Sequence, residues 1–344
     1  MGSTLTVEKM MGFLYELPEQ FQNSAAMEIN LPERYYQSFT NIVVSGLGGS
    51  AIGGDILKSY AASGGSVPIV VNRDYHIPAF VNGKTLFFAV SYSGNTEETL
   101  SAYKEAVAKG AAIVCVTGGG KLSEWAKQDG NAVISVPVGL VPRAATGYLF
   151  APLALVLEKL GILRGVKDEL EETAKVLRNL RSRINPNVGT PENQALAIAQ
   201  RLKDSLPVIW GSSSLSEAAA LRWKAQINEN AKCPAYYNIF PELNHNEIVG
   251  FEVPSDLITN TSIIILKDQF ENDRIQRRIE ITTNIIKDKV KNVIEVNSEG
   301  NSFLSRFYSL VYIGDYASVY LALEYGLNPT PVEVIDYLKE QLAK

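Results

Sequence analysis

Glycines and hydroxyl side chains follow two short apolar segments in the first third of the chain. The first group, S-G-L-G-G-S, spans residues 45–50, and the second, S-Y-S-G-N-T-E-E-T, spans residues 91–99. Glycines let backbone N–H groups approach an anion closely, and Ser91, Ser93 and Thr96 would surround one tight turn at the start of a helix. Together the two loops predict a phosphate site. Taken alone, each hydroxyl could simply cap its helix.

The same glycines do not predict a nucleotide cofactor. Their spacing departs from G-x-G-x-x-G, and no acidic residue clearly ends the next predicted strand, where a dinucleotide ribose would need one. A metal ion is not expected either, because the two histidines, His76 and His245, and the two cysteines, Cys115 and Cys233, form no recognisable zinc motif in the sequence. We therefore expect neither a cofactor nor a metal.

Three side chains elsewhere could move protons or stabilise negative charge. Glu229 lies in N-E-N at the end of a predicted helix, where the helix dipole disfavours an anion, so a role as a base would explain its position. His245 lies in the polar run P-E-L-N-H-N-E and could shuttle a proton. Arg143, in V-P-R-A-A-T-G after the fifth predicted strand, could stabilise an oxyanion. Each of them, considered alone, also fits an ordinary surface residue.

Other polar residues have a sufficient structural explanation. His76 precedes an Ile-Pro turn with no acidic or hydroxyl cluster around it in the sequence, so we interpret it as structural. Near the end, N-P-T-P-V-E-V-I-D-Y-L-K places Thr330 and Glu333 in the positions of a capping box. Lys339 falls on the helix that follows, and alone it would be a surface lysine.

Short apolar runs alternate with helix-length stretches through the first half, which predicts a parallel sheet covered on both faces. The expected strands are 41–45, 68–71, 85–90, 112–117 and 132–138, and the expected helices include 51–62 and 97–109. Parallel sheets bind ligands beyond the carboxyl ends of their strands. Both phosphate loops and Arg143 would lie at that end.

The strand and helix pattern starts again after a turn-rich segment at residues 185–191. A helical region over 152–183 precedes it, and the elements expected after it are helices 192–203, 217–230 and 273–287, strands 207–210, 262–266 and 293–296, and a C-terminal helix. This repetition indicates an internal duplication. We expect an α/β protein of two doubly wound parallel-sheet domains, residues 1–163 and, with a linker helix, residues 164–344.

Length and charge agree with this picture. At 344 residues, with 46% hydrophobic and 20% charged residues, the chain can form two globular cores. The net charge of -5 and the scattered basic residues exclude a broad positive surface for nucleic acid. Two widely separated cysteines, no leader sequence and no long unbroken apolar run predict a cytoplasmic protein without a membrane partner.

The two loops carry a resemblance to a known family. The pattern strand-S-x-S-G-x-T-x-E resembles the signature of the sugar isomerase (SIS) domain, and G-L-G-G-S resembles its companion loop. SIS domains bind phosphorylated sugars through such loops, and the second half lacks the hydroxyls at the corresponding loop, K-D-Q-F-E-N-D. Only the first half should therefore bind phosphate in this way. The phosphate ligands implied by the resemblance are Gly48, Gly49, Ser50, Ser91, Ser93 and Thr96.

Nearly the whole chain is similar to the metal-independent bifunctional phosphoglucose/phosphomannose isomerases, on the motifs N-E-N, N-H-N-E, P-R-A-x-x-G and a P-T-P-V helix ending in Lys. The resemblance implies interconversion of glucose 6-phosphate and mannose 6-phosphate with fructose 6-phosphate through a cis-enediol. It makes Glu229 the base at C2 and Arg143 the enediolate stabiliser, with His245 and Lys339 assisting ring opening. Thr330 resembles a position linked to acceptance of mannose 6-phosphate. In that family the histidine enters from the neighbouring subunit, which implies a homodimer with shared sites.

Two other functions remain open. Another SIS activity on amino-sugar phosphates, such as the isomerase part of hexosamine synthesis, also uses a carboxylate, a histidine and a lysine, although the chain carries no amidotransferase domain. A non-catalytic sugar-phosphate sensor would use the same loops. Such sensors usually carry a helix-turn-helix unit, and none is evident here.

Overall fold

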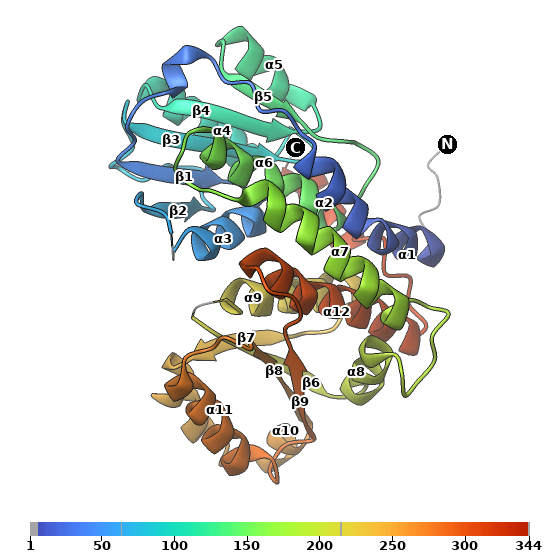
Figure 1. Ribbon diagram of the computed structural model, residues 1–344. Coiled ribbons are helices and arrows are strands. Elements are labelled where there is room, and N and C mark those ends of the chain that lie inside the picture. The colour runs from blue at the N-terminus through green and yellow to red at the C-terminus, as the bar shows by residue number, and fades with distance from the viewer. Residues whose placement is uncertain (1–5, 63, 214, 343–344) are drawn as a thin grey trace. The chain divides into compact units, whose positions relative to one another are not determined.

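The computed structural model describes residues 6–62, 64–213 and 215–342, which form two compact units (Figure 1). The N-terminal unit contains residues 17–175 and 300–305. The C-terminal unit contains residues 176–299 and 306–344 together with 1–16, as far as these are described. The first helix of the chain thus belongs to the unit that the second half mainly supplies. The division into domains at 1–163 and 164–344 stays a prediction.

The N-terminal unit is built on a five-stranded parallel sheet with the strand order β2-β1-β3-β4-β5. Its strands are β1 (Asn41–Ser45), β2 (Ile69–Asn72), β3 (Thr85–Ser91), β4 (Ala112–Thr117) and β5 (Ala132–Ser135). All five predicted strands are therefore confirmed, although β5 ends three residues earlier than its apolar run. The chain reverses its direction of travel across the sheet between β1 and β3, and ligands bind at such a switch point in open α/β sheets.

Helices cover both faces of this sheet, as its apolar strands require. They are α2 (Leu17–Ala25), α3 (Gly49–Ala61), α4 (Glu97–Ala108), α5 (Gly120–Gln128), α6 (Thr146–Lys159) and the first part of α7 (Val166–Ile184). On one face, Phe87 and Ile113 pack against Leu100 of α4 and Leu122 of α5. Helices α3 and α6 pack against each other and against the strands. The predicted helical region over 152–183 is confirmed: it consists of two helices, α6 and α7, which a turn separates.

The C-terminal unit repeats the arrangement with four parallel strands in the order β7-β6-β8-β9. The strands are β6 (Leu206–Ser212), β7 (Tyr236–Phe240), β8 (Thr261–Lys267) and β9 (Asn292–Asn297). Apart from a missing fifth strand, this is the order of the first sheet, which agrees with the expected duplication. Strand β7 was not predicted: it is an edge strand, with Tyr236 and Tyr237 exposed, so it lacks the buried apolar run that marks the others.

Seven complete helices and the last part of α7 accompany the second sheet among the described residues. They are α1 (Val7–Tyr15), α8 (Gln194–Leu202), α9 (Glu217–Gln226), α10 (Ser255–Thr259), α11 (Asp273–Ile286), α12 (Phe303–Glu324) and α13 (Glu333–Leu342). Trp210, Ile263 and Ile279 form part of a core between the strands and α11. In the parts of the chain that the structure describes, no helix has both the length and the apolar character needed to span a bilayer.

Helix α9 is fixed to α12 by polar and close apolar contacts. The Arg222 guanidinium donates to Asp315, with Nε–Oδ1 and Nη2–Oδ2 distances of 3.1 and 2.7 Å, and both side chains are 2% exposed. Gln226 donates to the same carboxylate at 2.9 Å. Gly314 is required beside Trp223, because a Cβ at residue 314 would lie 2.3 Å from the indole ring. These contacts hold the end of α9, where the predicted base follows.

Candidate active site

The loop between β1 and α3 is shaped by its glycines. A Cβ at Gly46 would lie 2.9 Å from the carbonyl oxygen of Val90 in β3. Gly48 caps α3 with a φ of 54°, a left-handed conformation that glycine adopts without strain. In the described residues, the N–H groups of Gly48 and Gly49 have no protein acceptor. The loop therefore offers two free amides at the start of a helix of 13 residues, where the helix dipole favours an anion.

The loop between β3 and α4 gathers the predicted hydroxyls. The hydroxyls of Ser91 and Thr96 are 2.9 Å apart, and Ser91 Oγ also accepts from the N–H of Gly94 at 3.1 Å. Ser93 Oγ accepts from the N–H of Asn95 at 3.2 Å. Ser91 is fully buried, whereas Ser93 is exposed. The hydroxyl groups of this turn therefore range from fully buried at Ser91 to exposed at Ser93.

A contact at the switch point joins the two loops. The N–H of Tyr92 donates to Ser50 Oγ at 3.4 Å, and Ser50 is 6% exposed. Each loop begins where its strand ends, and β1 and β3 are neighbours in the sheet. The structure therefore brings together all six residues predicted to bind phosphate.

Arg143 lies in the same place. It belongs to a short 3-10 turn, Pro142–Ala144, after β5, and it is buried. A Cβ at Gly49 would lie 2.8 Å from the carbonyl oxygen of Pro142 and 3.4 Å from the Cα of Arg143. The missing side chain of Gly49 therefore lets the Arg143 turn pack directly against the first turn of α3.

Glu229 lies on a π-helical turn, Ile227–Ala231, which continues α9. The predicted helix over residues 217–230 is confirmed, and its last turn is π-helical rather than α-helical. Asn228 donates to the carbonyl of Cys233 at 2.8 Å and Asn230 to Ser318 Oγ at 2.9 Å, so both neighbours are bound to the protein while Glu229 stays half-buried. π-Helical turns are rare in proteins, and those that do form are frequently found at functional sites.

Thr330 lies close to this turn, and Lys232 connects the two. Lys232 Nζ donates to the carbonyl oxygen of Glu229 at 2.5 Å and to that of Pro331 at 2.7 Å. Thr330 is 1% exposed, and its hydroxyl donates to the carbonyl of Thr6 at 3.0 Å. Sequence reasoning missed Lys232; its position after N-E-N-A, at the end of a helix, was the available signal.

His245 and Lys339 occupy exposed positions of the C-terminal unit. His245 ends a 3-10 turn, Glu242–Asn244, and Lys339 lies on α13, whose residues are all exposed. Within the described residues, neither side chain has a hydrogen bond or ion pair with Glu229. Glu247 anchors the His245 loop by accepting from Trp210 Nε1 at 2.7 Å. Glu247 thus fixes the loop that carries His245.

His76 has an acidic partner that the sequence did not reveal. Its Nδ1 lies 2.7 Å from Glu105 on α4, 29 residues further along, and the N–H of Ile77 donates to the other oxygen of that carboxylate at 3.0 Å. This hydrogen bond raises the pKa of His76. The pair is exposed and ties a surface turn to a helix, which supports the structural interpretation of His76.

The place in the second sheet that corresponds to the phosphate loops is filled by the chain itself. The hydroxyl of Ser212, the last residue of β6, donates to the carboxylate of Glu271, which follows β8. Glu271 also accepts from the N–H of Asn272 at 3.1 Å. Ser212 and Glu271 are buried. An internal carboxylate thus occupies the switch point of the second sheet, which supports the expectation that only the first half binds phosphate.

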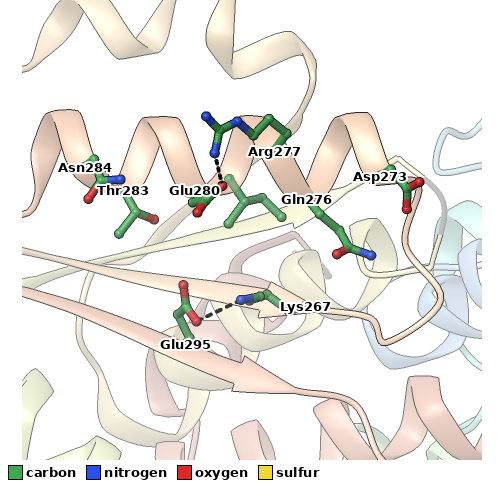
Figure 2. A pocket seen from close by; sticks show the side chains of 9 residues that line it. Lys267, Asp273, Gln276, Arg277, Glu280, Thr283, Asn284 and Glu295 are labelled. Atoms are coloured by element: carbon green, nitrogen blue, oxygen red, sulfur yellow. Dashed lines mark hydrogen bonds and ion pairs between the residues drawn. The ribbon is translucent and has the colours of Figure 1, made fainter.

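A separate hollow of about 550 Å³ lies between α11 and the strands β8 and β9 (Figure 2). Lys267 pairs there with Glu295 at 2.9 Å, and Arg277 pairs with Glu280. None of its nine lining residues is a predicted site residue. Among the described residues, no group of three or more His, Cys, Asp or Glu side chains is arranged to hold a metal ion.

Two protein-family models match the chain. The SIS domain matches residues 35–139, and the bacterial phospho-glucose isomerase C-terminal SIS domain matches residues 191–342. Among solved structures, the C-terminal domain of glucosamine-fructose-6-phosphate aminotransferase from Francisella tularensis superposes with a TM-score of 0.72 at 16% identity, over 93% of this chain and 97% of that one. These matches confirm the predicted fold of two SIS domains.

Curated relatives extend over most of the sequence. A D-glucosamine-6-phosphate 4-epimerase from Sulfolobus acidocaldarius is 32% identical over 87% of this chain and 88% of the relative. The bifunctional phosphoglucose/phosphomannose isomerase from Caldicellulosiruptor bescii is 48% identical over 96% of this chain and 98% of the relative. At that identity over nearly the full length, the chain belongs to the bifunctional phosphoglucose/phosphomannose isomerase family.

Proposed function

We propose that the protein is an aldose-ketose isomerase that interconverts glucose 6-phosphate and mannose 6-phosphate with fructose 6-phosphate. Family membership supports the reaction, and the joined pair of hydroxyl loops at the β1/β3 switch point is the observation that carries the substrate class. The two aldose phosphates differ only in configuration at C2 and share one enediol. A single site can therefore serve both.

The phosphate is bound in this proposal at the loops of the N-terminal unit. The free amides of Gly48 and Gly49 donate to its oxygens, and α3 and α4 both begin there with favourable dipoles. The hydroxyls of Ser50, Ser91, Ser93 and Thr96 supply the remaining donors.

The chemistry follows from a base and a cation. In the aldose-to-ketose direction, Glu229 removes the proton from C2, and a proton returned to C1 completes the 1,2-shift; the reverse order gives the aldose. Reprotonation of C2 on one face or the other gives the glucose or the mannose epimer. Arg143 stabilises the negative charge of the enediolate. His245 and Lys339 assist opening of the sugar ring, and Thr330 supports acceptance of mannose 6-phosphate.

We further propose a cytoplasmic homodimer in which His245 of the partner subunit completes each site. The exposure of His245 supports this arrangement. Mixing Glu229→Ala and His245→Ala proteins tests it. Shared sites predict partial recovery of activity in the mixture, whereas recovery would be absent if each chain used its own histidine.

A coupled assay with fructose 6-phosphate tests the main proposal. Both glucose 6-phosphate and mannose 6-phosphate should appear, a chelator should not inhibit, and Glu229→Gln should lose activity by a factor of at least about 10³. Retained activity in Glu229→Gln would remove the proposed base. Production of only one aldose phosphate would remove the dual specificity.

The Sulfolobus relative makes an amino-sugar phosphate the second candidate substrate. Glucosamine 6-phosphate is the discriminating compound, because the same loops could hold its phosphate. Turnover of glucosamine 6-phosphate with none of fructose 6-phosphate would favour that candidate. Binding of either compound without any turnover would identify a sensor.

A further inference from the structure

Lys232 directs its side-chain donors to the main chain. Its Nζ lies 2.5 Å from the carbonyl oxygen of Glu229, 2.7 Å from that of Pro331 and 3.3 Å from that of Pro329. A lysine ammonium has three N–H donors and no acceptor, so three carbonyls match its capacity. The side chain therefore works as a clamp between main-chain segments.

The backbone of Lys232 gives an independent indication of this role. Lys232 has a φ of 58° and a ψ of 22°, the left-handed conformation that glycine or asparagine usually supplies at the end of a helix. The last carbonyls of a helix lack intrahelical partners and carry partial negative charge. A lysine at this position satisfies one such carbonyl, that of Glu229, which neither glycine nor asparagine could reach in the same way.

The clamp joins two segments that are far apart in sequence. Lys232 and Pro331 are 99 residues apart, and the carbonyls that it binds flank Thr330 on both sides. Thr330 is held in turn by Thr6 and by Asn328, whose Oδ1 accepts from the N–H of Thr330 at 3.0 Å. The Thr330 segment is thus a fixed support, and Lys232 fixes the Glu229 turn to it.

We propose that Lys232 is a positioning residue for the isomerase: it holds the base-carrying turn in register with the Thr330 segment. This inference rests on the proposed function. A base must be held within a fraction of an ångström of its productive position, and a displacement of about 1 Å can lower the rate by about 10²-fold. Moving Glu229 relative to Thr330 would also change the rates of proton transfer at the two faces of C2 unequally. The ratio of glucose 6-phosphate to mannose 6-phosphate in the product should therefore shift.

Three variants of Lys232 separate the effect of its ammonium group from the effect of its left-handed backbone conformation. Lys232→Met keeps the length of the side chain and removes the donors, Lys232→Asn tolerates the left-handed backbone and also lacks the ammonium, and Lys232→Arg keeps charged donors. The matched control is Lys291→Met, because Lys291 Nζ likewise donates to two backbone carbonyls, those of Lys203 and Asp204 at 2.8 and 2.9 Å. Lys291 is in the same unit and does not contact the Glu229 turn.

The expected result is a loss in kcat with little change in KM. Lys232→Met and Lys232→Asn should both lower kcat for fructose 6-phosphate about 10- to 100-fold, with KM within about threefold, and both should change the product ratio. Lys232→Arg should recover much of the rate, and Lys291→Met should resemble the wild type. If Lys232→Met fails to fold, the product ratio in Lys232→Asn and Lys232→Arg carries the test.

Other outcomes separate this inference from the proposed function. Normal activity of Lys232→Asn beside a defective Lys232→Met would mean that the backbone conformation matters and the ammonium does not, which would overturn the proposal. So would a wild-type product ratio in all Lys232 variants while Glu229→Gln is inactive; the isomerase assignment would then stand. A wild-type protein that isomerises neither sugar phosphate would instead refute the proposed function, and with it this inference.

Discussion

Removing the buried guanidinium beneath the Glu229 turn should strongly destabilise the C-terminal unit. Arg222→Met leaves Asp315 without its bidentate partner, in a place where only 2% of either side chain is exposed. Breaking such a pair from one side costs about 3–5 kcal/mol, because a carboxylate remains buried without compensation. For a unit of this size, about 2–4 °C of melting temperature is lost per kcal/mol, so we expect a decrease of roughly 6–20 °C.

The reference for this measurement is the double variant Arg222→Met/Asp315→Asn. It removes both charges, and the asparagine oxygen can still accept from Gln226, whose side chain donates to Asp315 at 2.9 Å in the native protein. Because buried ion pairs are often no more stable than neutral replacements, the double variant should be more stable than Arg222→Met by about 2 kcal/mol or more. Thermal unfolding followed by circular dichroism and calorimetry gives both values.

The pH dependence of Arg222→Met provides a second check. Burial raises the pKa of Asp315, and the guanidinium opposes this effect in the native protein. Without Arg222 the folded-state pKa of Asp315 lies further above its unfolded value. The folded state then binds a proton more tightly than the unfolded state, so stability should fall as pH rises from the unfolded pKa of about 4 toward the folded pKa. A loss below about 1 kcal/mol, or a double variant less stable than Arg222→Met, would refute the reasoning.

Three further predictions concern the loops and the histidine. Ser91→Ala removes a buried hydroxyl from the phosphate turn and should raise KM for fructose 6-phosphate about tenfold with kcat changed less than about threefold in the coupled assay. Glu271→Gln weakens the bond from Ser212 and should lower the free energy of unfolding by about 1–3 kcal/mol in denaturant titrations, without changing KM. NMR should give His76 a pKa above 6.5, and this pKa should return toward 6.5 in Glu105→Gln. Because the pKa of Glu105 is lowered as well, the pair stabilises the fold most between about pH 4.5 and 6.5. Its contribution is lost as pH rises through the folded-state pKa of His76.

The sequence predicted those features that depend on neighbours along the chain. Apolar runs of four to seven residues bounded by turn formers marked the buried strands, and the bounds of β1 and β4 were correct to the residue. The loops after β1 and β3 could be paired from the sequence, since the carboxyl ends of parallel strands meet at one edge. The contact between Tyr92 and Ser50 follows from that rule.

Features that depend on residues far apart in the sequence were missed, because no local pattern marks them. The π-helical turn of Glu229 is fixed by Asn230 bonding to Ser318, 88 residues away, and Lys232 reaches carbonyls 97 and 99 residues away. Helical periodicity gives no sign of either. His76 looked isolated because its partner, Glu105, comes from the next helix of the sheet rather than from its own turn.

The two halves of the duplication differ most at the point where their topology is the same. In the first sheet the amides of Gly48 and Gly49 at the β1/β3 switch point have no protein acceptor in the described chain, so water or an external anion satisfies them. In the second sheet the hydroxyl of Ser212 is buried and would be costly without a partner, and Glu271 supplies one from within the chain. A carboxylate in that position both satisfies the loop and repels a phosphate. The second half could then keep its sheet while its other loops changed, and the proposed base on the turn after α9 belongs to a part of the fold that no longer has to bind the anion.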